Sequence, residues 1–78
     1  MPHISIKMLK GRTEEQKKKV ANALADALVS SLGCSRTHVS VTVEDYTPVE
    51  WQDVFEQEIT NKKDKLYISP GYDPKDLL

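Results

Sequence analysis

The chain has 78 residues, with 11 basic and 12 acidic side chains and a formal net charge of −1. That length suffices for a single domain, residues 1–78, near the lower limit for a hydrophobic core without disulfides or metals. The balanced charge favours neither nucleic acid nor an anionic membrane, and no apolar run reaches the length of a transmembrane helix. We therefore expect a small cytoplasmic protein that needs a partner subunit to complete its core.

Cysteine and histidine are too sparse for a structural metal or a disulfide. Cys34 is the only cysteine, which excludes an internal disulfide and favours a reducing compartment. There is no CxxC motif, and His3 and His38 are far apart in the sequence. Since zinc sites need several such ligands at short spacing, no metal is expected.

The first predicted element is a strand over residues 2–9, in which apolar and polar residues alternate. Pro2 falls in register with the apolar, core-facing set, whereas His3 falls on the opposite face. If Met1 is removed, the Pro2 nitrogen becomes a free secondary amine rather than a tertiary amide. An α-amino group titrates at roughly 7.7–8.0, and a general base works best near the operating pH. Pro2 is therefore a candidate base; the plainer interpretation is that proline is merely a common second residue.

A long helix is predicted between Thr13 and Gly33. Thr13 and Gln16 have the spacing of a capping box, Gly11 lies in the turn before it, and Gly33 provides a stop. One face of this helix carries an apolar stripe of Val20, Leu24, Ala27, Leu28 and Leu32.

A second strand is predicted at 38–45, and a second helix follows it. Strand, long helix and strand form a βαβ unit with parallel strands and a right-handed crossover. Thr47, Pro48 and Glu50 then provide a cap, a proline at the first helical position and a second capping box. The second helix is expected to fray near residue 61, and the tail over 62–78 to drape over the surface or a partner.

The predicted fold class is α/β (α+β): one βαβ unit with a second helix. A two-stranded parallel sheet leaves one face and both edges exposed, and such a sheet is not expected to be stable alone. The simplest solution is a symmetric homodimer whose sheets join or pack face to face.

The same residues resemble the 4-oxalocrotonate tautomerase family. The resemblance rests on Pro2 at the head of a strand, Gly11-Arg12 after it, the Glu-Glu-Gln-Lys helix start, and strand residues 39–44. It extends from Pro2 to about Trp51 without a gap. The longer second helix and the Pro-Gly-Tyr tail look like the short dimeric bacterial branch, with a hexamer built as a trimer of dimers as the alternative.

The resemblance implies cofactor-free proton transfer on an enolic or unsaturated 2-keto acid, with Pro2 as the general base. Arg12 matches the arginine that grips the substrate carboxylate, a role that suits a bidentate and permanently charged guanidinium; alternatively it is an exposed turn residue. Trp51 matches an aromatic residue that lines the pocket and excludes water, and a core tryptophan is the other interpretation.

One position departs from the family pattern. Ser40 stands where hexameric members carry a second arginine, and Arg36 is expected to be a solvated loop residue rather than its replacement. A serine cannot pair with a second carboxylate, so a monocarboxylate such as an aryl enolpyruvate fits better, with Trp51 or Phe55 as a flat apolar wall.

Two other functions remain open from the sequence. A hydratase or dehalogenase of the same superfamily would need a water-activating carboxylate near Pro2. Glu44 and Asp45 are adjacent in a strand, point to opposite faces, and are expected to be solvated. A non-catalytic homo-oligomeric binding module on the same scaffold is the second alternative.

Overall fold

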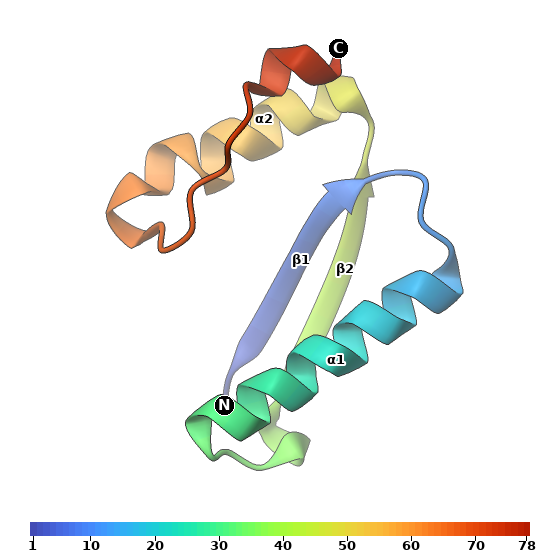
Figure 1. The fold of residues 1–78 in the computed structure, drawn as a ribbon, viewed down its shortest axis with the longest axis vertical. Helices are drawn as coiled ribbons and strands as arrows, with labels where there is room; N and C mark the ends of the chain where they lie inside the picture. Colours follow the sequence, from blue (N-terminus) through green and yellow to red (C-terminus); the bar gives the residue numbers. More distant parts are fainter. The chain divides into compact units, whose positions relative to one another are not determined.

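The computed structural model describes all residues, Met1–Leu78, and separates into two compact units (Figure 1). Unit 1 comprises Met1–Asp45 and unit 2 comprises Tyr46–Leu78. No helix in either unit is both long enough and apolar enough to cross a membrane.

Unit 1 is the predicted βαβ unit. It contains β1 (His3–Leu9), α1 (Glu14–Leu32), a short 3-10 helix η1 (Arg36–His38) and β2 (Ser40–Tyr46, whose last residue belongs to unit 2). The two strands are parallel neighbours in a two-stranded sheet, and α1 connects them by running back along one face (Figure 1). The α/β class and the parallel pairing are confirmed.

The second strand begins later than predicted. Residues 36–38 form η1, so His38 is not part of the strand, and β2 starts at Ser40. The reason is local: the Ser35 hydroxyl accepts the Thr37 N–H, and the His38 N–H donates to the Ser35 carbonyl at 3.0 Å. These bonds bend the chain into a turn before it can extend.

Both predicted capping boxes are present. In α1 the Gln16 N–H donates to Thr13 Oγ1 at 3.1 Å, and the Thr13 N–H donates to Gln16 Oε1 at 2.9 Å. Thr47 and Glu50 form the equivalent pair of bonds in α2, at 3.2 and 2.8 Å. Gly33 ends α1 with φ 70°, a left-handed conformation in which glycine carries no Cβ penalty.

The apolar stripe of α1 is only partly covered. Ala25 is the one fully buried residue of the chain, at 1% exposure. Val20 and Leu28 are half-buried, whereas Leu24 is 40% and Leu32 68% exposed. A single copy of the chain therefore lacks a closed hydrophobic core.

Unit 2 consists of α2 (Pro48–Glu58), η2 (Thr60–Lys65) and η3 (Pro74–Leu77). The α-helix ends at Glu58, before residue 61, and 3-10 turns continue from there. The tail folds back on α2, as Figure 1 shows, because Gln52 Nε2 donates to the Pro74 carbonyl at 2.8 Å.

Candidate active site

Pro2 lies at the head of β1, where β2 also begins. Its carbonyl oxygen accepts the Ser40 N–H at 3.2 Å, so the first ladder bond of the sheet holds the proline backbone. Pro2 is half-buried, while Met1 before it is 92% exposed. With Met1 attached the Pro2 nitrogen is an amide, and its removal would create the amine at a fixed position in the sheet.

A polar cluster of His3, Ser40 and Thr42 adjoins Pro2 on the sheet face opposite α1. His3 Nδ1 lies 2.7 Å from Ser40 Oγ, and His3 Nε2 lies 3.5 Å from Thr42 Oγ1. All three side chains are exposed. Alternation in the first strand predicted that His3 points away from the core, but only the register of the two parallel strands brings it to Ser40 and Thr42.

Arg12 follows the other end of β1. It is exposed, and the preceding Gly11 has φ 130°, a conformation that side chains rarely adopt. The seven residues of β1 span roughly 23 Å at about 3.3 Å per residue. Pro2 and Arg12 of one chain are therefore held at opposite ends of a strand, and the structure does not bring them together.

Trp51 belongs to an aromatic cluster within unit 2. Its indole Nε1–H donates to the Tyr72 hydroxyl at 2.9 Å, and its ring centroid lies 6.3 Å from that of Tyr46. Phe55 meets Tyr72 edge to face at 5.6 Å. Trp51 thus packs as a half-buried helix residue, and its place in a substrate pocket with Pro2 stays a prediction.

Arg36 is exposed, as expected from the sequence, but its guanidinium is also held by two side chains of α1. Its Nε donates to Asp26 Oδ1 at 3.0 Å and its Nη2 donates to Asn22 Oδ1 at 2.8 Å. Both partners lie on α1, so Arg36 ties η1 to that helix. This use of its guanidinium agrees with the prediction that Arg36 does not replace a second substrate arginine.

The two carboxylates near the end of β2 point to opposite faces, as predicted, and each meets a lysine. Glu44 pairs with Lys7 at 3.0 Å, and Asp45 pairs with Lys17 of α1 at 2.6 Å. The Asp45 side chain is only 21% exposed, so it is less solvated than expected. Its hydrogen bond with Lys17 raises the pKa of that ammonium, with attraction to Asp45 and Glu14 adding to the effect while burial opposes it.

These carboxylates stand far along β2 from Ser40, the residue that bonds to Pro2. Within one chain, neither is placed to activate water at the proline. No three His, Cys, Asp or Glu side chains gather as a metal site would require.

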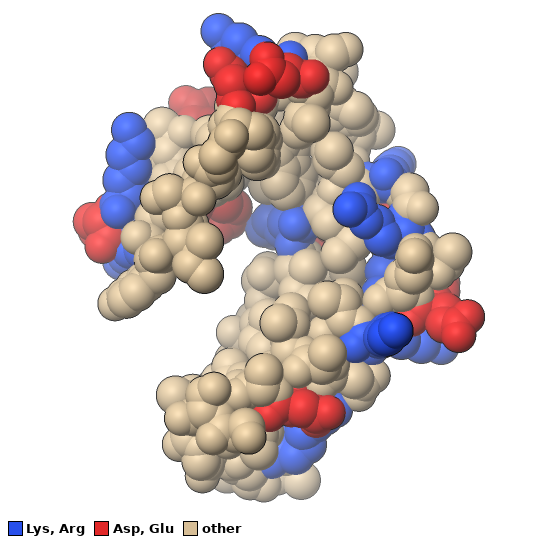
Figure 2. All heavy atoms as spheres, viewed as in Figure 1, with Lys and Arg blue, Asp and Glu red and all other residues tan.

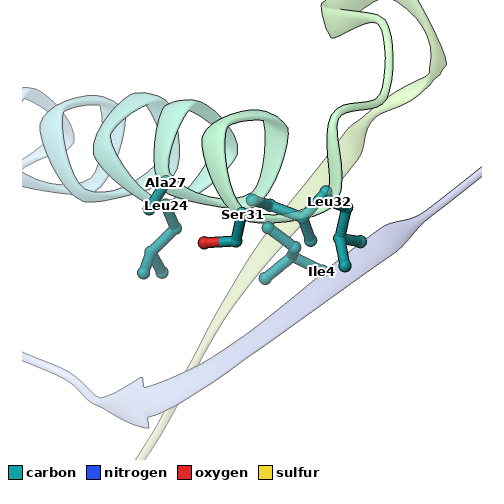
Figure 3. A pocket seen from close by; sticks show the side chains of 6 residues that line it. Ile4, Leu24, Ala27, Ser31 and Leu32 are labelled. Atoms are coloured by element: carbon teal, nitrogen blue, oxygen red, sulfur yellow. The ribbon is translucent and has the colours of Figure 1, made fainter.

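An open apolar groove runs between β1 and α1. Figure 3 shows the side chains that line it, which are Ile4, Leu24, Ala27, Leu28, Ser31 and Leu32. No residue of β2 contributes. Figure 2 shows mainly uncharged atoms over the end of unit 1 where the last turns of α1 approach the N-terminus. The groove is an uncovered apolar surface beside the free edge of β1.

The comparisons with known proteins agree with this fold. The family model described as "Tautomerase enzyme" matches residues 2–54. A probable tautomerase of Xylella fastidiosa is 37% identical over 73 residues, covering 92% of this chain and 89% of that protein. Tautomerase PptA of Klebsiella pneumoniae is 34% identical, covering 92% of this chain and 97% of the relative.

A solved structure shares the fold. The crystal structure of YwhB, a homologue of 4-oxalocrotonate tautomerase, matches with a TM-score of 0.63 and 23% identity, covering 99% of this chain and all of that one. The chain belongs to the tautomerase family. Tautomerases are isomerases that act on small molecules, and the chain is accordingly an enzyme of this class.

Proposed function

We propose that the chain is a cofactor-independent keto–enol tautomerase of enolic or unsaturated 2-keto acids, with the amine of Pro2 as its general base after Met1 is removed. The observation that carries this proposal is the position of Pro2 at the head of β1, where Ser40 holds its carbonyl. We place the activity in the cytoplasm, where the single thiol of Cys34 would stay reduced.

The reaction moves one proton within the substrate. The uncharged Pro2 amine takes the proton of the enol hydroxyl, which leaves an enolate and a protonated amine. The amine then returns the proton to the carbon at the other end of the enol double bond, and the carbonyl forms. An amine with a pKa near neutrality serves both steps, because it must accept and then release the same proton.

The carboxylate of the substrate is assigned to Arg12, and this assignment calls for a second copy of the chain. Within one chain Arg12 and Pro2 flank opposite ends of β1. If the free β1 edges of two copies pair antiparallel, the start of one strand lies beside the end of the other, so each Pro2 meets the partner's Arg12. A bidentate guanidinium would then hold the carboxylate beside the amine.

The open groove supports association at the same edge. The groove is lined by apolar side chains, and almost no residue of a single copy is fully buried. One copy therefore leaves exposed the apolar surface that a stable fold must bury. The outer sheet face carries His3, Ser40 and the Lys7–Glu44 ion pair, so it is too polar for face-to-face packing. We therefore propose a homodimer joined along β1 rather than across the sheet face; a trimer of such dimers is the alternative.

The preferred substrate is a monocarboxylic aryl enol such as phenylenolpyruvate. β2 carries no arginine, and Arg36 is engaged with Asp26 and Asn22. A second carboxylate would lack a cationic partner. The proposed aromatic wall is Trp51, supported by Tyr72 and Phe55 in unit 2.

Replacement of the base tests the proposal. Intact mass first establishes that Met1 is absent, and ketonisation of phenylenolpyruvate is then followed by ultraviolet absorbance. Because a positioned general base contributes about 10²–10⁴-fold, Pro2→Ala should lower kcat by at least about 100-fold. Protein that retains Met1 should be equally inactive. Unchanged turnover in Pro2→Ala would rule out a specific need for the proline nitrogen, and full turnover in protein that retains Met1 would exclude the Pro2 amine as the base, because that nitrogen is then an amide.

A further inference from the structure

We infer that His3 is a second substrate contact, and that its ring Nε2 donates a hydrogen bond to the enol oxygen whose charge develops during proton transfer. Ser40 is the positioning residue that aims the ring. This inference rests on the proposed function. It assigns to His3, aimed by Ser40, the stabilisation of negative charge on the substrate oxygen, since β2 has no arginine for that purpose.

The first support is the position of the cluster beside the base. Pro2 and His3 are consecutive, with Cα atoms about 3.8 Å apart. Ser40 bonds to both residues, through its backbone N–H to the Pro2 carbonyl at 3.2 Å and through its hydroxyl to the His3 ring at 2.7 Å. Ser40 therefore holds both the His3 ring and the Pro2 backbone at the first hydrogen bond between the two strands.

The second support is the way the two ring nitrogens are used. Nδ1 makes the short bond of 2.7 Å to Ser40, whereas Nε2 reaches Thr42 only at 3.5 Å, the outer limit of a hydrogen bond. If Nδ1 accepts the Ser40 hydroxyl, Nε2 carries the ring proton. A substrate oxygen at ordinary distance would replace the weak Thr42 contact at little cost.

The third support is a contrast on the same sheet face. Further along the two strands Lys7 and Glu44 close on each other at 3.0 Å, in the pattern of a structural cross-strand pair. His3 instead stands exposed at the end of the sheet nearest Pro2, with one ring nitrogen in a short hydrogen bond and the other in only a weak contact.

The chemistry of the step needs such a donor. As Pro2 takes the enol proton, negative charge collects on the substrate oxygen. An imidazole N–H in a fixed orientation stabilises that charge more than it stabilises the uncharged enol, so its benefit appears in the transition state. Proton and charge balance are unchanged, since His3 only donates a hydrogen bond and keeps its proton.

The kinetic test uses the full chain with Met1 removed and compares four variants with phenylenolpyruvate as substrate. His3→Asn keeps a group at the Nδ1 position and loses the distal donor, so kcat and kcat/KM should both fall about 10- to 100-fold. His3→Gln places an amide donor near the Nε2 position and should recover most of that loss. Ser40→Ala should give a smaller loss, about three- to tenfold. His38→Asn, at the exposed histidine of η1, is the matched control and should equal the wild type.

A binding measurement separates this inference from the proposed function. In the wild-type protein, addition of the keto acid phenylpyruvate should shift the ring nitrogen resonance of His3 Nε2 and leave His38 unmoved. If neither ring responds, or if His3→Asn matches the wild type while Pro2→Ala is inactive, the His3 inference is wrong and the proline mechanism stands. If His3 responds while Pro2→Ala keeps full activity, the proline mechanism is wrong and His3 stands as a ligand contact.

Discussion

The two units of the chain differ in how far they cover their own apolar side chains. Unit 1 leaves a groove open between β1 and α1 and fully buries only Ala25. Unit 2 closes an aromatic cluster on itself, with the tail held to α2 by bonds from Trp51 to Tyr72 and from Gln52 to Pro74. The unit that carries Pro2, the proposed base, is therefore the one whose apolar surface is left open.

That difference links assembly to catalysis. Unit 1 holds Pro2 and Arg12 at opposite ends of one strand, and its groove lies between α1 and Ile4 of the same strand. In the proposed dimer, association along β1 would both cover the groove and complete the site. No residue of unit 2 lines this groove. Substitutions in unit 2 should therefore change the stability of the fold more than the assembly of the dimer.

The largest effect is expected from a charge in the groove. Leu24→Glu places a carboxylate among Ile4, Leu28 and Leu32, and a charge buried there without a partner is strongly unfavourable. The dimer should be lost at micromolar concentration, together with the activity, as sedimentation velocity would show. Val49→Glu is the matched control, because Val49 is 72% exposed at the start of α2. An intact dimer in Leu24→Glu would mean that the groove is not the interface.

The next effect concerns Arg12. Arg12→Ala should lower kcat/KM about 10- to 100-fold, since it removes a charge-assisted bond to the carboxylate. Lys10→Ala, at an exposed neighbour, should have little effect on kcat/KM.

A mixing experiment tests whether the two residues act across the dimer. When Pro2→Ala and Arg12→Ala chains are unfolded together and refolded, half of the dimers are mixed and each has one complete site. About a quarter of the wild-type activity should return. No recovery would indicate that both residues act within one chain.

A smaller effect is expected within unit 2. Tyr72→Phe removes the acceptor of the Trp51 indole N–H and keeps the edge contact with Phe55, so the free energy of unfolding should fall by about 1 kcal/mol. Denaturant unfolding followed by the fluorescence of Trp51, the single tryptophan, measures the change. Tyr67→Phe, at a ring that is 97% exposed, should have no effect. Equal stability of the two variants would contradict the closed cluster.

The smallest effect is a pH dependence in unit 1. The hydrogen bond to Asp45 raises the pKa of Lys17 above 10.5, so its contribution to stability is complete below that pH and is lost as the pH rises through the raised pKa. Lys17→Met should show a weaker loss of stability above pH 10.5 than the wild type in thermal unfolding. Lys18→Met, at the exposed neighbour, should follow the wild-type curve. An unchanged alkaline profile in Lys17→Met would argue against the pair.

Local signals in the sequence predicted most of the elements correctly. Thr13 and Thr47 begin the two helices, because a capping hydroxyl and the residue three positions later need only each other. The start of the second strand was misplaced, since the Ser35 turn that holds His38 competes with extension and leaves no mark on the alternating pattern.

The sequence by itself determined the βαβ order, the two capping boxes and the place of Pro2 at the head of a strand, because these depend on neighbours within a few residues. The tertiary structure decided the rest. Strand register joined His3 to Ser40, the turn at Ser35 gave Arg36 its partners on α1, and helix packing left the apolar stripe of α1 half open. These features depend on residues far apart in the chain, and periodicity specifies which face a side chain occupies but not which side chain it meets.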